Sequence, residues 1–387
     1  MQTLRFDVRD LLRAPRLAFS LQRIWIQWLG TGGGYLIYLL FSYAALMAQG
    51  ASLAGVWQSH GLLPCLPGAQ GSAPWYAWLL WGLGVAALLI AFLYTNTAVA
   101  RAAYMHLKGN HFYSWRESFA FAGKKIASII SAPFSLLILI LLLVFSSMIL
   151  GWMGRIPFIG ALGISFFTII WFLAALFIVY TLVVTVVSLW HTPAIIAATD
   201  EDAFEAVFQS FSLTWTQPWR LLLYQAADLF IAAAATGFFA FVVKKSLVLM
   251  NRLFGLFMGA DYNTFAVHGQ GLLQAGLIKL EALLHAPFQP LIAQLYYSEA
   301  FILGNTTTMP ATIHLSSYFY FFSLLFIAGF VLAYGLSCYT IGNVLTILAL
   351  RKRKDGENLL ERKDREEQDE DPGAEFTKPT AGIDSPQ

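Results

Sequence analysis

The sequence has few charged residues, and they are unevenly distributed. Only 12% of its residues are charged, against about 25% in an average soluble domain. Three long stretches, 24–100, 156–199 and 300–350, contain no Asp, Glu, Lys or Arg. A soluble fold needs charge on its surface, whereas a charge at the centre of a bilayer costs about 2.5–3.5 kcal/mol. The charge-free stretches therefore exclude a soluble protein and predict a membrane protein.

Cysteine and catalytic motifs are also scarce. The two cysteines, Cys65 and Cys338, are predicted to lie in different compartments, so a disulfide within the chain is not expected and no spacing suggests a metal cluster. The sequence contains no Walker motif, no HExxH pair and no Ser/His/Asp arrangement. The run Gly32–Gly34 lacks the pattern of a phosphate loop and instead predicts close helix packing or a kink. We expect no cofactor, no metal and no nucleic-acid partner, and the sequence favours a protein that is not an enzyme.

Six apolar stretches are long enough to cross a bilayer, which takes about 20 residues as a helix. They are residues 24–47, 75–98, 126–153, 161–189, 221–243 and 318–348. Because backbone groups in lipid must be hydrogen-bonded within the protein, each stretch is predicted to be a helix. The first is too long to be the core of a cleaved signal peptide. The predicted fold is an all-α polytopic transmembrane helical bundle of about six spans in three hairpins, forming a transmembrane domain over residues 24–350.

The basic residues predict which side of the membrane each connecting segment occupies. If the N-terminus is inside, the inner segments are 1–23, 101–125, 191–220 and the tail 351–387. Together they hold 19 of the 24 Lys and Arg residues. Because basic segments stay on the cytoplasmic side, both termini are predicted to be cytoplasmic, which requires an even number of spans. The protein is expected in the cytoplasmic (inner) membrane.

The N-terminal segment, residues 1–23, is basic and amphipathic. Arg5, Arg9, Arg13 and Arg16 fall on one helical face beside apolar residues. This pattern is typical of a helix that lies in the headgroup layer with its apolar side toward the lipid. The alternative is an ordinary basic flank that only sets the topology.

A weak internal repeat marks two short amphipathic segments, which we call elbows. Residues 117–121, with the sequence ESFAF, precede the third span, and residues 209–213, QSFSL, precede the fifth. A third elbow is expected to begin at 351–356, after the sixth span. The remainder of the tail 351–387 holds many charges of both signs and is predicted to be solvated. Three hairpins, each followed by an elbow, are therefore expected, and internal repeats of this kind are common in transporter folds.

The predicted outer segment 244–313 is the least regular part of the chain. Within it, Leu272–Leu284 is apolar except for Lys279 and Glu281. A seventh span here would place the basic run 351–354 outside, against the charge rule. We therefore predict an outer helical subdomain that lies on or dips into the membrane, and a re-entrant pair around residues 272–291 is the alternative.

Three polar residues are candidates for function. Asp228 is the only ionisable residue well inside a predicted span, and intramembrane carboxylates serve as proton or cation ligands or hold helices together. The alternative is an Asp near the inner interface that is hydrated or bonded to a neighbouring hydroxyl. Glu281 and His285 are four residues apart and would share a helix face. A carboxylate with an imidazole suits acid–base chemistry or part of a zinc site, and a simple hydrogen-bonded pair is the alternative.

The second elbow and its surroundings resemble a known group of proteins. The residues that carry this resemblance are Pro193-Ala194, Glu205-Ala206, Ser210-Phe211, Trp215 and Pro218-Trp219-Arg220. They are similar to an elbow in bacterial multi-pass membrane proteins of unknown function, including the membrane domain attached to some glycerophosphoryl diester phosphodiesterases. The resemblance implies a bacterial cytoplasmic membrane. This sequence has no soluble-looking stretch long enough for the phosphodiesterase domain, so the resemblance implies no catalytic residues.

These observations leave three functional hypotheses. The first is a non-enzymatic scaffold or accessory subunit whose partners are membrane lipids, other membrane proteins or a second copy of the chain. The second is a transporter or permease of a small or lipidic solute, with Asp228 near the pathway. The third is an intramembrane lipid enzyme, which requires Glu281 and His285 to converge with other polar groups.

Overall fold

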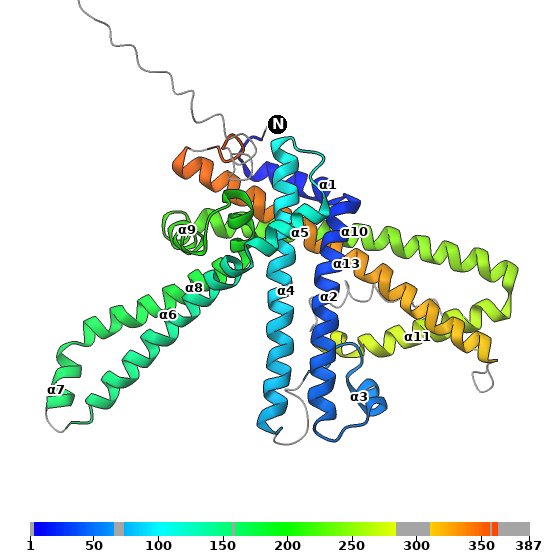
Figure 1. Cartoon of the computed structure of the whole chain (residues 1–387), viewed down its shortest axis with the longest axis horizontal. Helices are drawn as coiled ribbons and strands as arrows, with labels where there is room; N and C mark the ends of the chain where they lie inside the picture. Colours follow the sequence, from blue (N-terminus) through cyan, green and yellow to red (C-terminus); the bar gives the residue numbers. More distant parts are fainter. Residues whose placement is uncertain (1–3, 66–72, 157–158, 284–309, 357, 363–387) are drawn as a thin grey trace, which may run out of the picture.

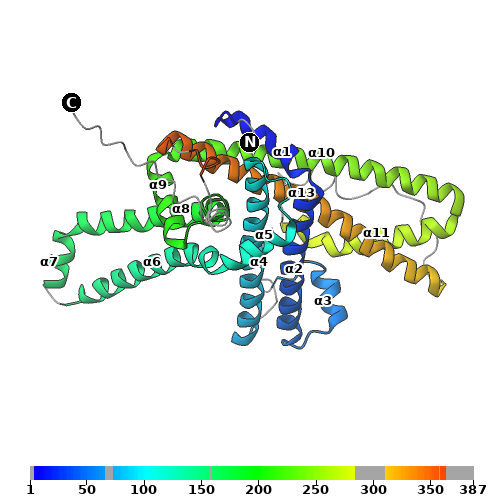
Figure 2. The ribbon, with the colours of Figure 1, turned by 45° about the horizontal axis from the view of Figure 1, so that its top comes forward.

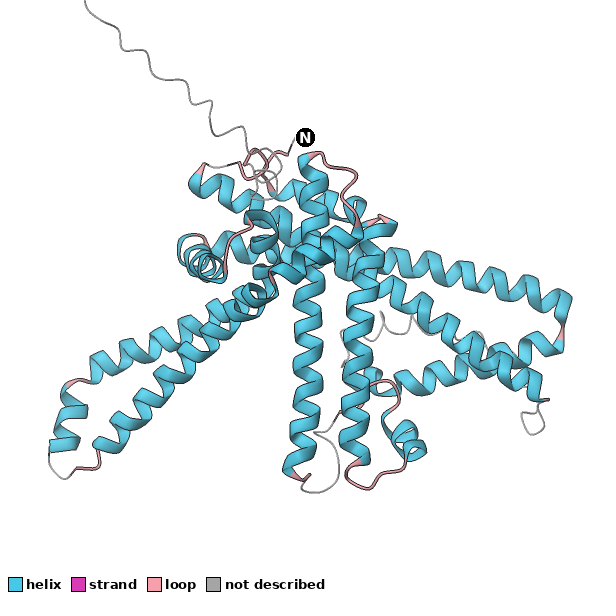
Figure 3. Cartoon of the chain, viewed as in Figure 1, coloured by secondary structure: helices cyan, strands magenta, loops and turns pink. Residues whose placement is uncertain are grey.

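The protein is built from three helical hairpins that diverge from a common end (Figure 1). The computed structural model describes residues 4–65, 73–156, 159–283, 310–356 and 358–362, and no strand occurs among them (Figure 3). The hairpin helices are α2 (Leu21–Met47) with α4 (Trp75–Lys108), α6 (Ile126–Met153) with α8 (Thr168–Thr199), and α10 (Pro218–Met258) with α13 (Ala311–Asp355).

These six helices are the ones in the described part of the chain that are long and apolar enough to cross a membrane. Each contains one of the six predicted spans or most of it. The predicted all-α polytopic bundle is therefore confirmed, and the helices support a multi-pass membrane protein.

Several helices are longer than the predicted spans. Helix α4 continues to Lys108 and α8 to Thr199, about ten residues beyond the apolar stretches. A polar residue ends an apolar stretch of sequence but does not end a helix. The helix ends only where the backbone leaves the helical conformation. Gly109 and Asp200 adopt left-handed conformations, with φ of 106° and 56°, and cap these two helices.

The elbows are short helices at the common end. The first is α5 (Trp115–Lys124) and the second is α9 (Ala203–Thr216). Helix α5 begins with a reciprocal cap. The backbone N–H of Glu117 donates to the Ser114 hydroxyl at 3.3 Å, and the Ser114 N–H donates to the Glu117 carboxylate at 2.8 Å.

The N-terminal segment is not one continuous amphipathic helix. It forms a 3-10 helix, η1 (Val8–Arg13), followed by one α-helical turn, α1 (Ala14–Ala18). The helix is then interrupted at Phe19 and Ser20 before α2 begins at Leu21. Leu11, Ala14, Leu17 and Ala18 are buried against the rest of the protein, whereas Leu12 is exposed.

The remaining helices lie at the opposite ends of the hairpins. Helix α3 (Leu53–His60) follows α2, and α7 (Ile159–Phe166) forms the tip of the second hairpin. Helix α10 runs through the start of the predicted outer segment, and α11 (Ala260–Leu283) then folds back against α13. The predicted outer subdomain is thus helical up to residue 283, and residues 284–309 lie outside the described part.

Two glycines bring α2 and α4 together. A Cβ placed on Gly34 would lie 2.4 Å from the Cβ of Ala91, and Gly30 is equally tight against α4. No atom lies within 4 Å of a Cβ placed on Gly32 or Gly33. Close packing is therefore confirmed for this part of the span, and the glycines that make it are four residues apart, as in the GxxxG pattern.

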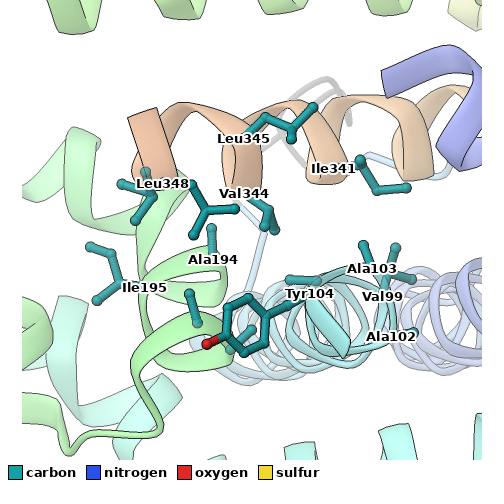
Figure 4. Close-up of a cluster of buried hydrophobic side chains, with 14 of the residues drawn as sticks. Val99, Ala102, Ala103, Tyr104, Ala194, Ile195, Ile341, Val344, Leu345 and Leu348 are labelled. Atoms are coloured by element: carbon teal, nitrogen blue, oxygen red, sulfur yellow. The ribbon is translucent and has the colours of Figure 1, made fainter. Parts of the chain in front are cut away.

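Burial is concentrated where the hairpins meet, in a region that we call the hub. The hub consists of residues 95–107 of α4, 191–200 of α8 and 337–350 of α13, together with η1, α1, α5 and α9. Figure 4 shows Val99, Tyr104, Ile195 and Val344 interdigitating at its centre. Away from the hub the hairpins separate, with α2 and α4 between the other two in both ribbon views (Figures 1 and 2).

Candidate functional site

The hub brings together all four segments that were predicted to share the inner side. The Lys125 ammonium, at the end of the first elbow, lies 3.0 Å from the Asp200 carboxylate at the end of α8. At the end of α13, Arg353 forms an ion pair with Asp7 of the N-terminal segment. The four segments therefore lie at one end of the molecule, as an even alternation of spans requires.

A buried arginine joins three elements of the hub. The side chain of Arg101 on α4 is fully buried. Its guanidinium donates to the backbone carbonyl of Ala197 on α8 at 3.0 Å and lies 4.2 Å from the ring centre of Phe121 on α5. The carbonyl and the aromatic face both attract the positive charge, so Arg101, the first charged residue after the second apolar stretch, cross-links the hub.

The two elbows predicted from the weak repeat are anchored in the same way. The Tyr94 hydroxyl on α4 donates to the carbonyl of Phe119 at 2.9 Å, and the two rings are stacked. The Tyr180 hydroxyl on α8 donates to the carbonyl of Phe211 at 3.2 Å, with the ring centres 5.9 Å apart. Each elbow is thus held by a tyrosine of the helix that precedes it. The ESFAF and QSFSL similarity therefore reflects a shared structure.

The N-terminal segment is held in the same way as the two elbows, and the expected start of an elbow at 351–356 is not found, because α13 continues to Asp355. The Tyr334 ring on α13 lies 5.8 Å from the ring of Phe19, and its hydroxyl donates to the carbonyl of Pro15 at 3.4 Å. Helix α1 packs against α13 as α5 packs against α4 and α9 against α8, so each hairpin has an elbow at its second helix. Sequence order hides this relation, because the partners are more than 300 residues apart.

Asp228 lies in the contact between α10 and α13. Its side chain is fully buried, and neither carboxylate oxygen receives a hydrogen bond from a described residue. The carboxylate sits against the backbone of α13 at Gly342, where an added Cβ would lie 1.6 Å from Oδ1 of Asp228. Asp228 is therefore buried between two helices of the protein, and its functional role stays a prediction.

Other polar side chains surround this carboxylate. The Gln225 amide, one helical turn before Asp228, donates to the Tyr339 hydroxyl at 2.7 Å. The Tyr339 hydroxyl also interacts with the side chain of Asn343. The amide oxygens of Gln225 and Asn343 have no hydrogen-bond partner among the described residues, and the same is true of the Thr346 hydroxyl.

A second polar contact ties α13 to the first hairpin. The Asn96 side-chain oxygen on α4 accepts from the Gln27 amide on α2 at 3.2 Å and from the Thr340 hydroxyl on α13 at 3.1 Å. These side chains are neutral, so they are not among the ionisable candidates predicted from the sequence. The signal that could have found them is an amide inside an otherwise apolar stretch, since amides and hydroxyls there bond between helices.

The predicted pair Glu281 and His285 is only partly within the described structure. Glu281 belongs to α11, but its side chain is not described, and His285 lies outside the described residues. Their pairing therefore stays a prediction. Among the described side chains, no group of three or more His, Cys, Asp or Glu residues is placed to hold a metal ion.

The hub is thus an assembly of helix ends held by aromatic, arginine and ion-pair contacts, with the Asp228 contact beside it. Comparison of the chain with models of protein families, with characterised proteins and with solved structures finds no match.

Proposed function

We propose that the protein is a non-enzymatic scaffold or accessory subunit of the bacterial cytoplasmic membrane. In this proposal the hub lies on the cytoplasmic side and holds three membrane hairpins apart. Each hairpin then offers an apolar flank to lipid or to the transmembrane helices of a partner. The distribution of basic residues supports the orientation, and the resemblance to bacterial multi-pass proteins supports the location.

The observation that carries this proposal is the contrast between the hub and the hairpins. Only 6% of the most apolar stretch of α6 and 11% of that of α8 is buried. Side chains such as Leu141 on α6 and Phe172 on α8 are 59% and 65% exposed. Surfaces this apolar require contact with lipid or other apolar helices, while the hub already secures the angle between hairpins.

A transporter is the alternative, and the packing around Asp228 argues against it. A transport pathway needs an ionisable residue that water or solute can reach. The carboxylate of Asp228 instead lies against the backbone of α13 at Gly342, in a buried helix contact. A fixed joint between two helices fits a scaffold better than a moving gate.

Photocrosslinking in intact membranes tests the scaffold. A benzophenone amino acid replaces Leu141 or Phe172 on the second hairpin, and Phe112, which is 96% exposed in the loop before α5, is the matched control. We expect the two hairpin positions to crosslink to lipid or to one stoichiometric membrane protein, and the control position to do neither. If they crosslink only to the other hairpins of the same chain, the hairpins close into a bundle and the proposal is wrong.

The proposed orientation has its own test in the native cysteines. Cys65 lies in the predicted first outer loop and is partly exposed, whereas Cys338 is fully buried in α13. A membrane-impermeant maleimide should label Cys65 when it reaches the outer face of the membrane and should not label it from the cytoplasmic face. The Cys65→Ser variant controls for labelling of Cys338. Labelling of Cys65 only from the cytoplasmic face would reverse the proposed orientation.

A further inference from the structure

The contact between α10 and α13 contains the buried carboxylate of Asp228, and no positively charged side chain among the described residues pairs with it. Both carboxylate oxygens also lack hydrogen-bond partners among these residues. A carboxylate buried in this way is strongly unfavourable unless one positive charge neutralises it. The site thus calls for a single positive charge.

The neighbouring atoms favour a metal cation over a proton. The amide oxygens of Gln225 and Asn343 and the hydroxyl oxygen of Thr346 are buried without partners, on the turns of α10 and α13 next to the Asp228–Gly342 contact. A proton on Asp228 could serve only one of these acceptors. A hard cation binds several oxygens at once.

We propose that this contact binds one monovalent metal cation of the sodium class. Asp228 supplies the charged ligand, and Gln225 and Asn343 supply neutral oxygens from the two helices. One carboxylate among neutral oxygens balances a single positive charge, whereas calcium sites usually gather several carboxylates. The bound cation would join α10 to α13 and so close the third hairpin. In this inference the cation is a structural ligand fixed between the two helices, which is compatible with the helix joint that the proposed scaffold function uses.

Direct binding to the purified full-length protein provides the first test. Equilibrium dialysis with radioactive sodium, at constant ionic strength set by choline chloride, should show one saturable site per chain. Asp228→Asn keeps the shape of the side chain but removes its charge, and we expect it to abolish the site. Asn343→Ala removes one neutral ligand and should weaken sodium binding about tenfold, the effect of losing one polar contact.

Thermal unfolding in detergent provides the second test and the control. The wild-type protein should unfold at a higher temperature in sodium chloride than in choline chloride, because a ligand that binds only the folded state stabilises it. The Asp200→Asn variant alters a buried carboxylate that already has a partner, Lys125, and should keep this sodium effect.

Three results would overturn the proposal. The first is the absence of saturable sodium binding to the wild-type protein, which can be measured even if the variants do not fold. The second is an equal sodium effect in Asp228→Asn. The third is a melting temperature that follows pH and not sodium, since Asp228 would then hold a proton.

Discussion

Replacement of Gly342 by alanine tests whether α13 touches the Asp228 carboxylate as closely as the structure shows. An added Cβ would lie 1.6 Å from Oδ1 and 2.2 Å from Cγ of Asp228. Ordinary carbon contacts begin near 3.4 Å, so either the whole carboxylate or the helix backbone must move. Because both are buried, the change resembles overpacking of a core, which typically costs 1–3 kcal/mol.

The expected net effect includes a small opposing term. Alanine is favoured over glycine inside a helix by about 1 kcal/mol, so Gly342→Ala should lower the free energy of unfolding by up to about 2 kcal/mol. Gly33→Ala on α2 is the matched control, because no atom lies within 4 Å of its added Cβ. We expect that control to be neutral or slightly stabilising. Reversible unfolding in mixed detergent micelles measures both variants.

A double-mutant cycle identifies the carboxylate as the obstacle. Asp228→Ala removes the atoms that the new Cβ would strike, so Gly342→Ala should cost at least 1 kcal/mol less in that background. If Gly342→Ala is no more destabilising than Gly33→Ala, or if its cost is the same with and without the carboxylate, the described contact between α10 and α13 is wrong.

Two further predictions concern the elbows and the first hairpin. Tyr94→Phe and Tyr180→Phe each keep the ring contact and lose one hydrogen bond to an elbow, so each should lower the free energy of unfolding by about 1 kcal/mol. The control, Tyr76→Phe at an exposed position, should have little effect. Equal effects of all three variants would refute the elbow contacts. Gly34→Ala should separate α2 from α4 at a cost of about 1–3 kcal/mol. The separation is measured as reduced crosslinking between cysteines placed on the two helices, and unchanged crosslinking would contradict the close packing of Gly34 against Ala91.

The sequence by itself determined the helical class, the six apolar helices and the grouping of the connecting segments. These depend on hydropathy and on the placement of Lys and Arg, which are local properties of the chain. The elbow repeat was also visible, because residues 117–121 and 209–213 keep similar side chains for the same contact with a tyrosine. Asp228 was recognised as unusual because no other ionisable residue lies so deep in a predicted span.

Only the tertiary structure decided how these parts are arranged. The N-terminal segment is held to the third hairpin through Tyr334 and Phe19, whose positions in the sequence show no relation. The partner of Asp228 is a glycine backbone on a helix more than 100 residues away, and glycine has no side chain that could signal such a role. The divergence of the three hairpins likewise arises from packing at the helix ends, where Arg101 and the buried residues of α4, α8 and α13 meet. Hydropathy predicts that a helix enters the membrane, but the contacts between helices determine its direction.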